Sequence, residues 1–314
     1  MRNNIKKYRL KNLNTPIVLI CFNRPAVTKK IFQQIKKQKP SKLFIIMDGP
    51  RLGNNIDLKN CKKVKKIISQ IDWKCKVFRN FSNDNLGLKK RVISGLDWVF
   101  KKVDRAIILE DDCYPNDSFF FFCETMLNFY KKNKNIGIIT GNNFQNKPVD
   151  DNSYYFSKYS HIWGWATWRR TWKLYNDNDQ KITNFIKSSK FKKICEISDE
   201  QKYWFDMHNQ IKSGVLKSWA YYFLLNMWKN NYLTVTPNLN LIKNLDINSV
   251  SSSNPSDSGL KIELTKTVLK FPLTHPKTIK VNKKADNKVF YSIYKRNIIT
   301  RAIYNIKKMI NIKD

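Results

Sequence analysis

The chain has 314 residues, of which 42% are hydrophobic and 13% aromatic, so it is long and apolar enough for a globular core and is not a disordered protein. It carries 59 Lys and Arg residues against 24 Asp and Glu residues, a formal net charge of +35, which favours nucleic acid, anionic membrane or phosphorylated ligands as partners. No stretch reaches the roughly 18 apolar residues of a membrane-spanning helix, and no apolar core of a signal peptide follows the basic N-terminus.

The six cysteines show no C-x-x-C spacing, which argues against a zinc or redox motif. Several of them stand within apolar patterns, where free cysteine behaves as a small hydrophobic residue. We therefore expect a reducing, cytoplasmic location, with a peripheral position on the inner membrane face.

The first half of the chain alternates apolar strands with amphipathic helices after a basic arm over 1–14. Strands are expected over 16–22, 42–47, 75–79, 106–109 and 136–140, and helices over 26–37, 57–71, 88–100 and 118–131. This alternation predicts an α/β fold with a mostly parallel central sheet that is flanked by helices.

Polar residues follow three of the expected strands. Asn23 and Arg24 follow the first, the segment 48–51 (DGPR) follows the second, and the segment 110–112 (EDD) follows the fourth. In sheets of this kind, ligands bind beyond the carboxyl ends of the strands, so the three segments together predict a binding site.

The acid triplet at 110–112 carries the most specific chemistry. Successive strand residues point to alternate sides, so at most two of the acids face one cleft. Adjacent carboxylates repel each other and are costly to bury unless a cation neutralises them, and Mg²⁺ or Mn²⁺ takes carboxylate oxygens, often shared with phosphates. The triplet favours a metal site for a phosphorylated substrate; the alternative is a solvated acidic turn.

The second half has a different character. An aromatic segment over 160–172 contains four Trp residues, and helices are expected over 180–197, 199–213 and 219–230, with short strands over 154–156 and 233–236. The Ser-rich segment 246–260 predicts a flexible loop. The basic extension 261–314 contains an amphipathic pattern over 289–312, which suits an anionic membrane surface or a helix that packs on its own domain.

Four segments resemble, in order and spacing, bacterial glycosyltransferases of the GT-A fold: TPIVLICFNRP, IIMDGPR, NLGLKKRVISGLDWVF and ILEDDCYP. The resemblance is to family 2-like and N-acetylglucosaminyltransferase I-like nucleotide-diphospho-sugar transferases. The later segments HIWGWATWRRTW and SWAYYFLLNMWKNNYLTVTPNLNLIKN resemble a bacterial branch of the same group. The resemblance implies a GT-A-like domain over 15–245, with a nucleotide-sugar half over 15–140 and an acceptor half over 141–245. A helical C-terminal extension would follow this domain.

The resemblance also implies roles for individual residues. Asp112 corresponds to the acid that holds Mn²⁺ or Mg²⁺ on the diphosphate. The expected donor-binding residues are Phe22, Asn23, Arg24, Asp48, Arg51, Glu110 and Asp111. Trp163, Trp165 and Trp219 are candidates for stacking on the acceptor sugar, with a place in the core as the alternative.

The catalytic base is the weak point of the resemblance. Several relatives carry an acid directly after the residue that corresponds to Trp219, where this chain has Ala220. Replacement candidates are Asp199, Glu200 and Asp206 on the preceding expected helix, and His161.

These expectations describe a metal-dependent hexosyl- or N-acetylhexosaminyltransferase that moves a sugar from a nucleoside diphosphate sugar, with UDP as the expected nucleotide. The acceptor would be a glycan or lipid-linked precursor of lipopolysaccharide, capsule or glycoprotein. The alternatives are a non-catalytic relative and a basic nucleic-acid-binding protein, although no specific nucleic acid is expected. A sugar nucleotidyltransferase would need a Gly-rich loop after the first strand, where this chain has Asn23-Arg24-Pro25.

Overall fold

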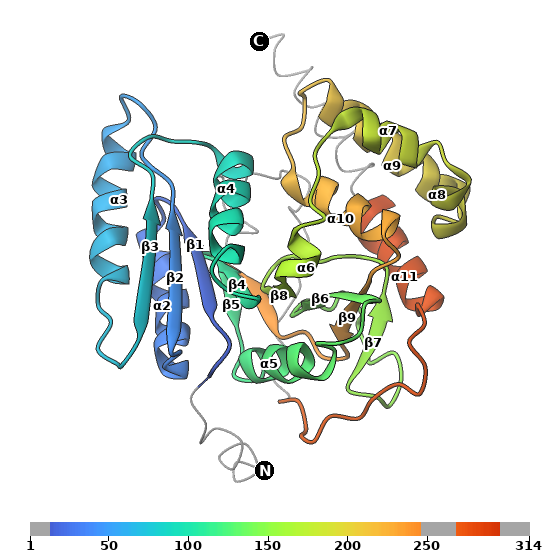
Figure 1. Cartoon of the computed structure of the whole chain (residues 1–314), viewed down its shortest axis with the longest axis horizontal. Helices are drawn as coiled ribbons and strands as arrows, with labels where there is room; N and C mark the ends of the chain where they lie inside the picture. The colour runs from blue at the N-terminus through green and yellow to red at the C-terminus, as the bar shows by residue number, and fades with distance from the viewer. Residues whose placement is uncertain (1–12, 246–267, 296–314) are drawn as a thin grey trace, which may run out of the picture.

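A computed structural model describes residues 13–245 and 268–295. An eight-stranded sheet in the order β3-β2-β1-β4-β8-β6-β9-β7 forms its centre (Figure 1). The strands are β1 (Ile17–Cys21), β2 (Lys42–Met47), β3 (Lys76–Phe81), β4 (Arg105–Glu110), β6 (Ile136–Thr140), β7 (Tyr154–Ser157), β8 (Trp165–Trp168) and β9 (Leu233–Pro237). Only β8 and β7 run against the others, so the predicted α/β fold with a mostly parallel central sheet is confirmed.

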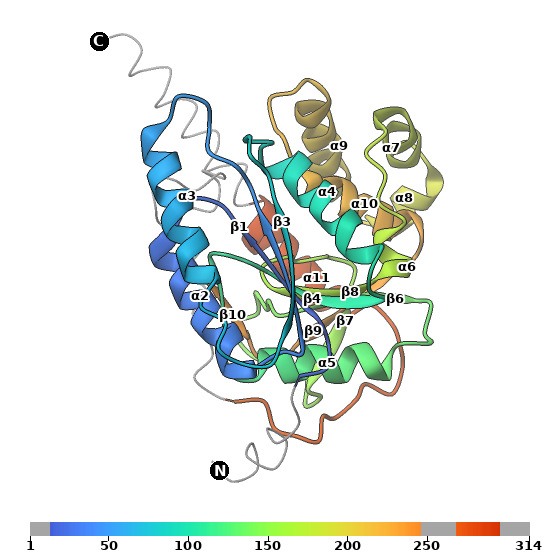
Figure 2. The ribbon, with the colours of Figure 1, turned by 60° about the vertical axis from the view of Figure 1, so that its left-hand side comes forward.

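Helices cover both faces of the sheet. Figure 2 shows α2 and α3 on one side of the first strands and α4 on the other. The helices are α2 (Pro25–Gln38), α3 (Asn55–Ile68), α4 (Leu88–Phe100), α5 (Phe119–Phe129), α6 (Arg169–Trp172), α7 (Asp179–Ile186), α8 (Ser189–Ile194), α9 (Ser198–Lys212), α10 (Trp219–Lys229) and α11 (Lys283–Val289). A π-helical turn, η2 (Phe290–Lys295), follows α11 directly.

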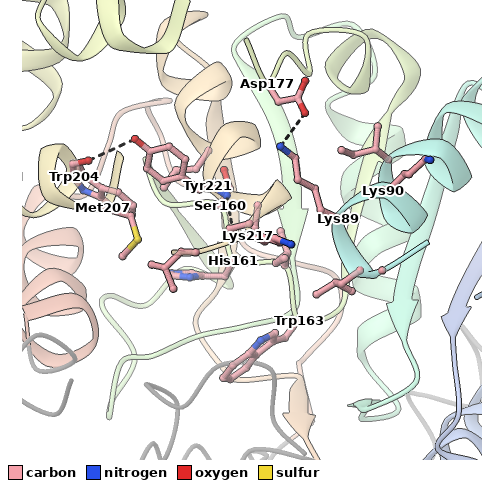
Figure 3. A pocket seen from close by; sticks show the side chains of 18 of the residues that line it. Lys89, Lys90, Ser160, His161, Trp163, Asp177, Trp204, Met207, Lys217 and Tyr221 are labelled. Carbon is pink, nitrogen blue, oxygen red and sulfur yellow. Dashed lines mark hydrogen bonds and ion pairs between the residues drawn. The ribbon is translucent and has the colours of Figure 1, made fainter. Parts of the chain in front are cut away.

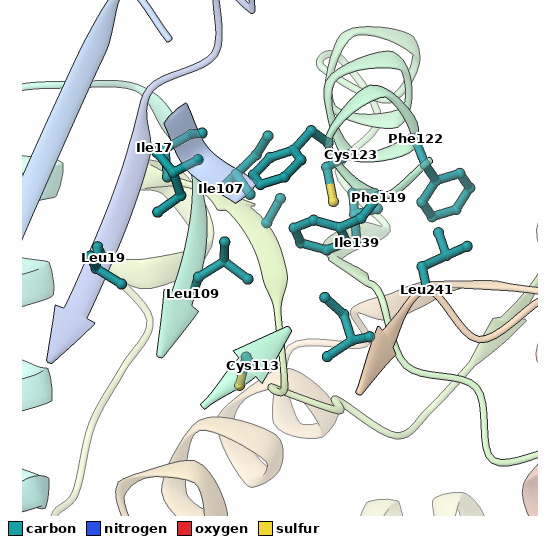
Figure 4. Close-up of a cluster of buried hydrophobic side chains, with 14 of the residues drawn as sticks. Ile17, Leu19, Ile107, Leu109, Cys113, Phe119, Phe122, Cys123, Ile139 and Leu241 are labelled. Atoms are coloured by element: carbon teal, nitrogen blue, oxygen red, sulfur yellow. The ribbon is translucent and has the colours of Figure 1, made fainter. Parts of the chain in front are cut away.

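Strand β1 shows why this sheet needs helices on both faces. Ile17 and Leu19 point into a core that contains side chains of α2, α3 and α5, whereas Val18 and Ile20 point into a second core beneath α4 and α10. Figure 4 shows part of the first core, where β1 and β4 meet α5. A strand with apolar residues at every position is stable only between two covered faces, which fixes the layered arrangement.

The aromatic segment and the second helical region contain features that the pattern did not predict. Strand β8 lies inside the expected aromatic segment and joins β4 to β6 at the centre of the sheet. The helix expected over 180–197 is two helices, because the Ser188 side chain accepts a hydrogen bond from the backbone N–H of Phe191 and so starts α8. Two further strands, β5 (Cys113–Pro115) and β10 (Ile242–Asn244), pair in a small separate sheet.

In the described part of the C-terminal extension, residues 268–282 are irregular and the helical part is α11 followed by η2. The arm over 1–12, the expected loop 246–260 and most of the expected amphipathic helix 289–312 lie outside the described residues. No helix in the described part of the chain has the length and apolar character needed to cross a membrane. All six cysteines lie in the described ranges, and each is a free thiol.

Candidate active site

The carboxyl ends of β1, β2 and β4 meet at one edge of the sheet. Cys21 lies opposite Met47 in the β1–β2 pairing, and Ile20 lies opposite Glu110 in the β1–β4 pairing. Because the strands are parallel and in this register, the segments 22–24, 48–51 and 110–112 leave the sheet side by side. The structure thus brings together the three polar strand ends that the sequence predicts as a site.

Arg24 ties the first strand end to the acid triplet. Its guanidinium forms an ion pair with Asp111 and donates to Asp112 Oδ2 over 3.1 Å. Asp111 is 2% exposed and also accepts hydrogen bonds from the backbone N–H of Phe22 (3.2 Å) and the hydroxyl of Thr28 (3.3 Å). Asp111 is thus engaged by Arg24, Phe22 and Thr28 in this structure, and its expected contact with a nucleotide stays a prediction.

Glu110 ends β4, and Asp112 lies in the turn that follows it; both are half-buried. Burial, followed by the negative charges of Asp112 and Asp111, raises the pKa of Glu110 to about 8, and Arg24 offsets this only in part. Burial likewise raises the pKa of Asp111. If all three acids were ionised, their negative charge would exceed what the Arg24 guanidinium can balance, which is why the raised pKa values favour protonation in the absence of a cation.

The donors at this edge match a hard divalent cation in chemical type. Such ions take carboxylate oxygens and fill their other positions with water or phosphate oxygens. Among residues 13–245 and 268–295, no group of three or more His, Cys, Asp and Glu side chains is placed to hold a metal ion.

Asp48 organises the loop before α4. Its carboxylate accepts hydrogen bonds from the backbone N–H groups of Gly49 (3.0 Å), Leu86 (2.9 Å) and Gly87 (3.0 Å). Asp48 is 6% exposed, and its carboxylate oxygens accept their hydrogen bonds from the loop. Asp48 thus has a structural role in holding this loop, and its expected contact with a base or ribose stays a prediction.

Asp57 is a site residue that the sequence reasoning missed. It is 1% exposed and accepts hydrogen bonds from Asn23 Nδ2 (2.6 Å), Arg51 Nε (2.5 Å) and Arg51 Nη2 (2.9 Å). The hydrogen bond from Arg51 is the main cause that lowers the pKa of Asp57 to about 2. The available signal was Asn54, which caps α3 and fixes the first turn that carries Asp57. Asn23 and Arg51 thus stand at the edge as expected, held by this buried acid.

A cavity of about 1000 Å³ begins at the loop that Asp48 holds (Figure 3). It lies between the start of α4, the segment 160–163, α9, the start of α10 and the turn η2. Its wall combines aromatic residues such as Trp163 and Tyr221 with the cations Lys89, Lys90 and Lys217. The acid triplet does not line this cavity. Asp48, at the end of β2, is thus linked to the cavity wall through its hydrogen bonds to Leu86 and Gly87.

The three candidate tryptophans have different environments. Trp163 is half-buried and lines the cavity, as expected for a residue that contacts a ligand. Trp165 and Trp219 are 1% and 3% exposed and stack on each other in the core, with 6.0 Å between ring centroids. The expected sugar contacts of Trp165 and Trp219 are therefore wrong, because their rings are covered by the sheet and α10.

None of the three predicted bases on α9 lines the cavity. Asp199 is exposed and forms an ion pair with Lys295 over 2.7 Å. Glu200 is 1% exposed and is paired with Lys158 over 2.7 Å, and Asp206 is exposed to solvent. The face of α9 that meets the cavity presents Tyr203, Trp204 and Met207, so the helix turns these acids elsewhere.

Two carboxylates that the sequence reasoning missed do line the cavity. Asp97 lies on α4 and accepts a hydrogen bond from the indole N–H of Trp172 over 2.7 Å. Asp177 forms an ion pair with Lys89 over 3.0 Å (Figure 3). Asp97 was detectable in the sequence, because Lys90, Ile93 and Asp97 follow helical spacing along one face of α4.

His161 also lines the cavity, packed against Phe144 with 4.4 Å between ring centroids. Burial lowers the pKa of His161 to about 3, so the imidazole is neutral at physiological pH. A group with so low a pKa is a weak general base near pH 7, although it can donate or accept a hydrogen bond.

Comparisons with known proteins give structural similarities only. No protein-family model matches the chain, and no curated protein sequence matches it. The mannosyltransferase PcManGT from Pyrobaculum calidifontis, in complex with GDP-Man and Mn²⁺, aligns at a TM-score of 0.33 and 6% identity, over 52% of this chain and 47% of that protein. This chain thus matches about half the length of that enzyme.

Two further structures align at similar levels. Mouse xyloside xylosyltransferase 1 in its apo form gives a TM-score of 0.35 and 10% identity, over 69% of this chain and 84% of that one. A UDP-glucose pyrophosphorylase complexed with UDP-glucose gives a TM-score of 0.28 and 9% identity, over 51% of this chain and 78% of that one. Similarities of this size are too low to assign a family or an activity, so the function of this chain has to be argued from its own residues.

Proposed function

We propose that the protein is a metal-dependent glycosyltransferase that uses a nucleoside diphosphate sugar, with UDP as the nucleotide. The observation that carries the proposal is the excess of acidic groups over cations at the carboxyl edge of the sheet, where Arg24 pairs with Asp111 and Asp112 beside Glu110. A divalent cation would relieve that excess and would attract a diphosphate to the same place.

In the proposed donor site, Asp112 holds the cation, with Glu110 as the second carboxylate. When bound, Mn²⁺ or Mg²⁺ would neutralise the negative charge that develops on the leaving diphosphate. Arg24 holds the two adjacent carboxylates in place, because its guanidinium pairs with Asp111 and Asp112 at once. Asp57 holds Asn23 and Arg51 at the rim, where the Arg51 side chain is 59% exposed and available to an anionic ligand.

In the proposed acceptor site, the cavity beside α4 binds the glycan. Asp97 is our choice of general base, since a neutral N–H from Trp172 holds its Oδ1 atom. The other carboxylate in the wall, Asp177, is already engaged in the ion pair with Lys89. Neutral His161 lies in the same wall and is suited to hydrogen-bond an acceptor hydroxyl.

A cell-surface glycan precursor is the acceptor class that we propose, and the net charge of +35 supports work near an anionic surface. This part of the proposal depends on composition and leaves the sugar and the linkage open to assay.

The test is release of nucleoside diphosphate from a panel of UDP-, GDP- and ADP-sugars, measured with Mn²⁺ and with EDTA. We expect metal-dependent turnover of at least one UDP-sugar and its loss in Asp112→Asn. The matched control is Asp104→Asn, which changes an exposed acid at the opposite end of β4 and should keep full activity. Undiminished turnover in EDTA, or in Asp112→Asn, contradicts the metal assignment.

A further inference from the structure

The C-terminal extension is attached to the domain by specific contacts beside the cavity. The backbone N–H of Asn282 donates to the carbonyl of Phe156 in β7 over 2.8 Å. Asp286 in α11 accepts hydrogen bonds from the hydroxyl of Ser157 (2.5 Å) and the backbone N–H of Lys158 (2.9 Å). Asp286 is 1% exposed, so these contacts fix the start of α11 against the end of β7.

The turn η2 then carries the chain to the cavity. Ile293 and Tyr294 of this turn line the cavity wall, opposite the start of α4 and the segment 160–163. Lys295 closes the turn with its ion pair to Asp199 on α9. A π-helical turn is rare and occurs frequently at functional sites, because it changes the direction in which side chains point.

Tyr294 joins an aromatic group at this wall. Its ring centroid lies 5.1 Å from that of Trp204, 5.7 Å from that of Tyr203 and 5.0 Å from that of Tyr159. Trp204 and Tyr203 also line the cavity, and Tyr294 itself is half-buried there. Figure 3 shows Trp204 and Met207 approaching the cavity from α9, with Trp163 on the other side.

We propose that the C-terminal extension completes the acceptor site and that Tyr294 is a specificity-determining residue that contacts the acceptor saccharide. This inference rests on the proposed function. An aromatic wall with polar tips suits a saccharide, whose ring has apolar C–H faces and hydroxyl edges. In this way, a segment that is distant from the acid triplet in sequence contributes to substrate recognition.

The probes are the methyl β-glycosides of glucose, galactose, mannose and N-acetylglucosamine, titrated against the full-length protein while intrinsic tryptophan fluorescence is followed. We expect saturable binding of at least one glycoside. Tyr294→Leu keeps an apolar side chain of moderate volume and should weaken that binding about tenfold, whereas Tyr294→Phe keeps the ring and should weaken it less than about threefold. Tyr291→Leu is the matched control, because Tyr291 lies on the same turn, is 47% exposed and does not line the cavity.

Binding of UDP with Mn²⁺ is measured on the same variants by calorimetry and should be unchanged. Unaltered glycoside binding in Tyr294→Leu, or no binding of any glycoside to the wild type, overturns the role of Tyr294. An equal loss in Tyr294→Leu and Tyr291→Leu also overturns it, since the effect would then be general to the turn. Failure of the wild type to bind UDP contradicts the proposed function instead, so the two failures are distinguishable.

Discussion

Replacing Glu110 with Gln should stabilise the protein in alkaline solution and have little effect in acid. The folded state raises the pKa of Glu110 from the ordinary value of 4.5 to about 8, so between these pH values the folded protein binds a proton more tightly than the unfolded chain does. Stability from this group is fully present below pH 4.5 and is lost as pH rises through 8. Gln cannot ionise, so the variant escapes this loss.

The magnitude follows from the size of the pKa shift. One pKa unit corresponds to about 1.4 kcal/mol, which gives a difference of roughly 3 kcal/mol between pH 5 and pH 8. For a chain of 314 residues, with an unfolding entropy of about 2.1 cal/mol/K per residue, such a difference changes the melting temperature by about 4–5 °C. The melting temperature of Glu110→Gln, relative to that of the wild type, should therefore rise by this amount when the pH is raised from 5 to 8.

The assay is thermal unfolding of both proteins at pH 5 and pH 8, with EDTA present so that no cation screens the acids. Glu196→Gln is the control, because Glu196 is exposed and paired with Lys283, which lowers its pKa. It should show no gain at pH 8. A difference between wild type and Glu110→Gln that is the same at both pH values would refute the reasoning that Glu110 is buried among uncompensated charges.

Three further predictions concern individual side chains. Asp57→Asn should lower the free energy of unfolding at pH 7 by roughly 1–3 kcal/mol, measured by denaturant titration, because the buried carboxylate, with its pKa of about 2, loses its charge-assisted hydrogen bonds. The difference between variant and wild type should shrink as pH falls through 3.8 towards 2, and a difference that stays constant would contradict this explanation. Trp165→Ala should cost about 3–5 kcal/mol in the same measurement, whereas Trp163→Ala should cost much less, and equal costs would contradict their assignment to core and cavity. Asp97→Asn should slow sugar transfer by a factor of about 10²–10⁴ in a steady-state assay with UDP binding intact, and an unchanged rate would exclude it as the base.

The strand ends were predictable because each depends on local pattern. Apolar runs such as 16–22 and 106–109 can be buried only between two layers of helices, and parallel strands bring their carboxyl ends to one edge. The position of Arg24 beside the acids follows from that topology and needs no information about distant packing. This is why the sequence predicts which strand ends meet at this edge, although the buried acid Asp57, which holds Asn23 and Arg51 there, was not predicted.

The acceptor side was less predictable because it depends on packing between distant segments. Trp163 and Trp165 stand two residues apart, yet Trp163 lies before β8 and lines the cavity, whereas Trp165 begins β8 and is buried in the core. The segment gave no strand signal of its own. Contacts with α10 and η2 decide which face of α9 meets the cavity. The sequence of α9 alone therefore could not show that Asp199 and Asp206 lie on another face. Likewise, nothing local reveals that Tyr294 returns to the cavity wall.

The central claim is that a divalent cation and a nucleoside diphosphate bind together at the acid triplet. The most direct test is the thermal shift of wild type and Asp112→Asn with UDP, with Mn²⁺ and with both. A ligand at 100 times its Kd stabilises the native state by about 2.7 kcal/mol. We predict that UDP with Mn²⁺ raises the melting temperature of the wild type well beyond the sum of the separate shifts and leaves Asp112→Asn unshifted. Equal shifts in the two proteins, or no shift with UDP and Mn²⁺ in folded wild type, would contradict the claim.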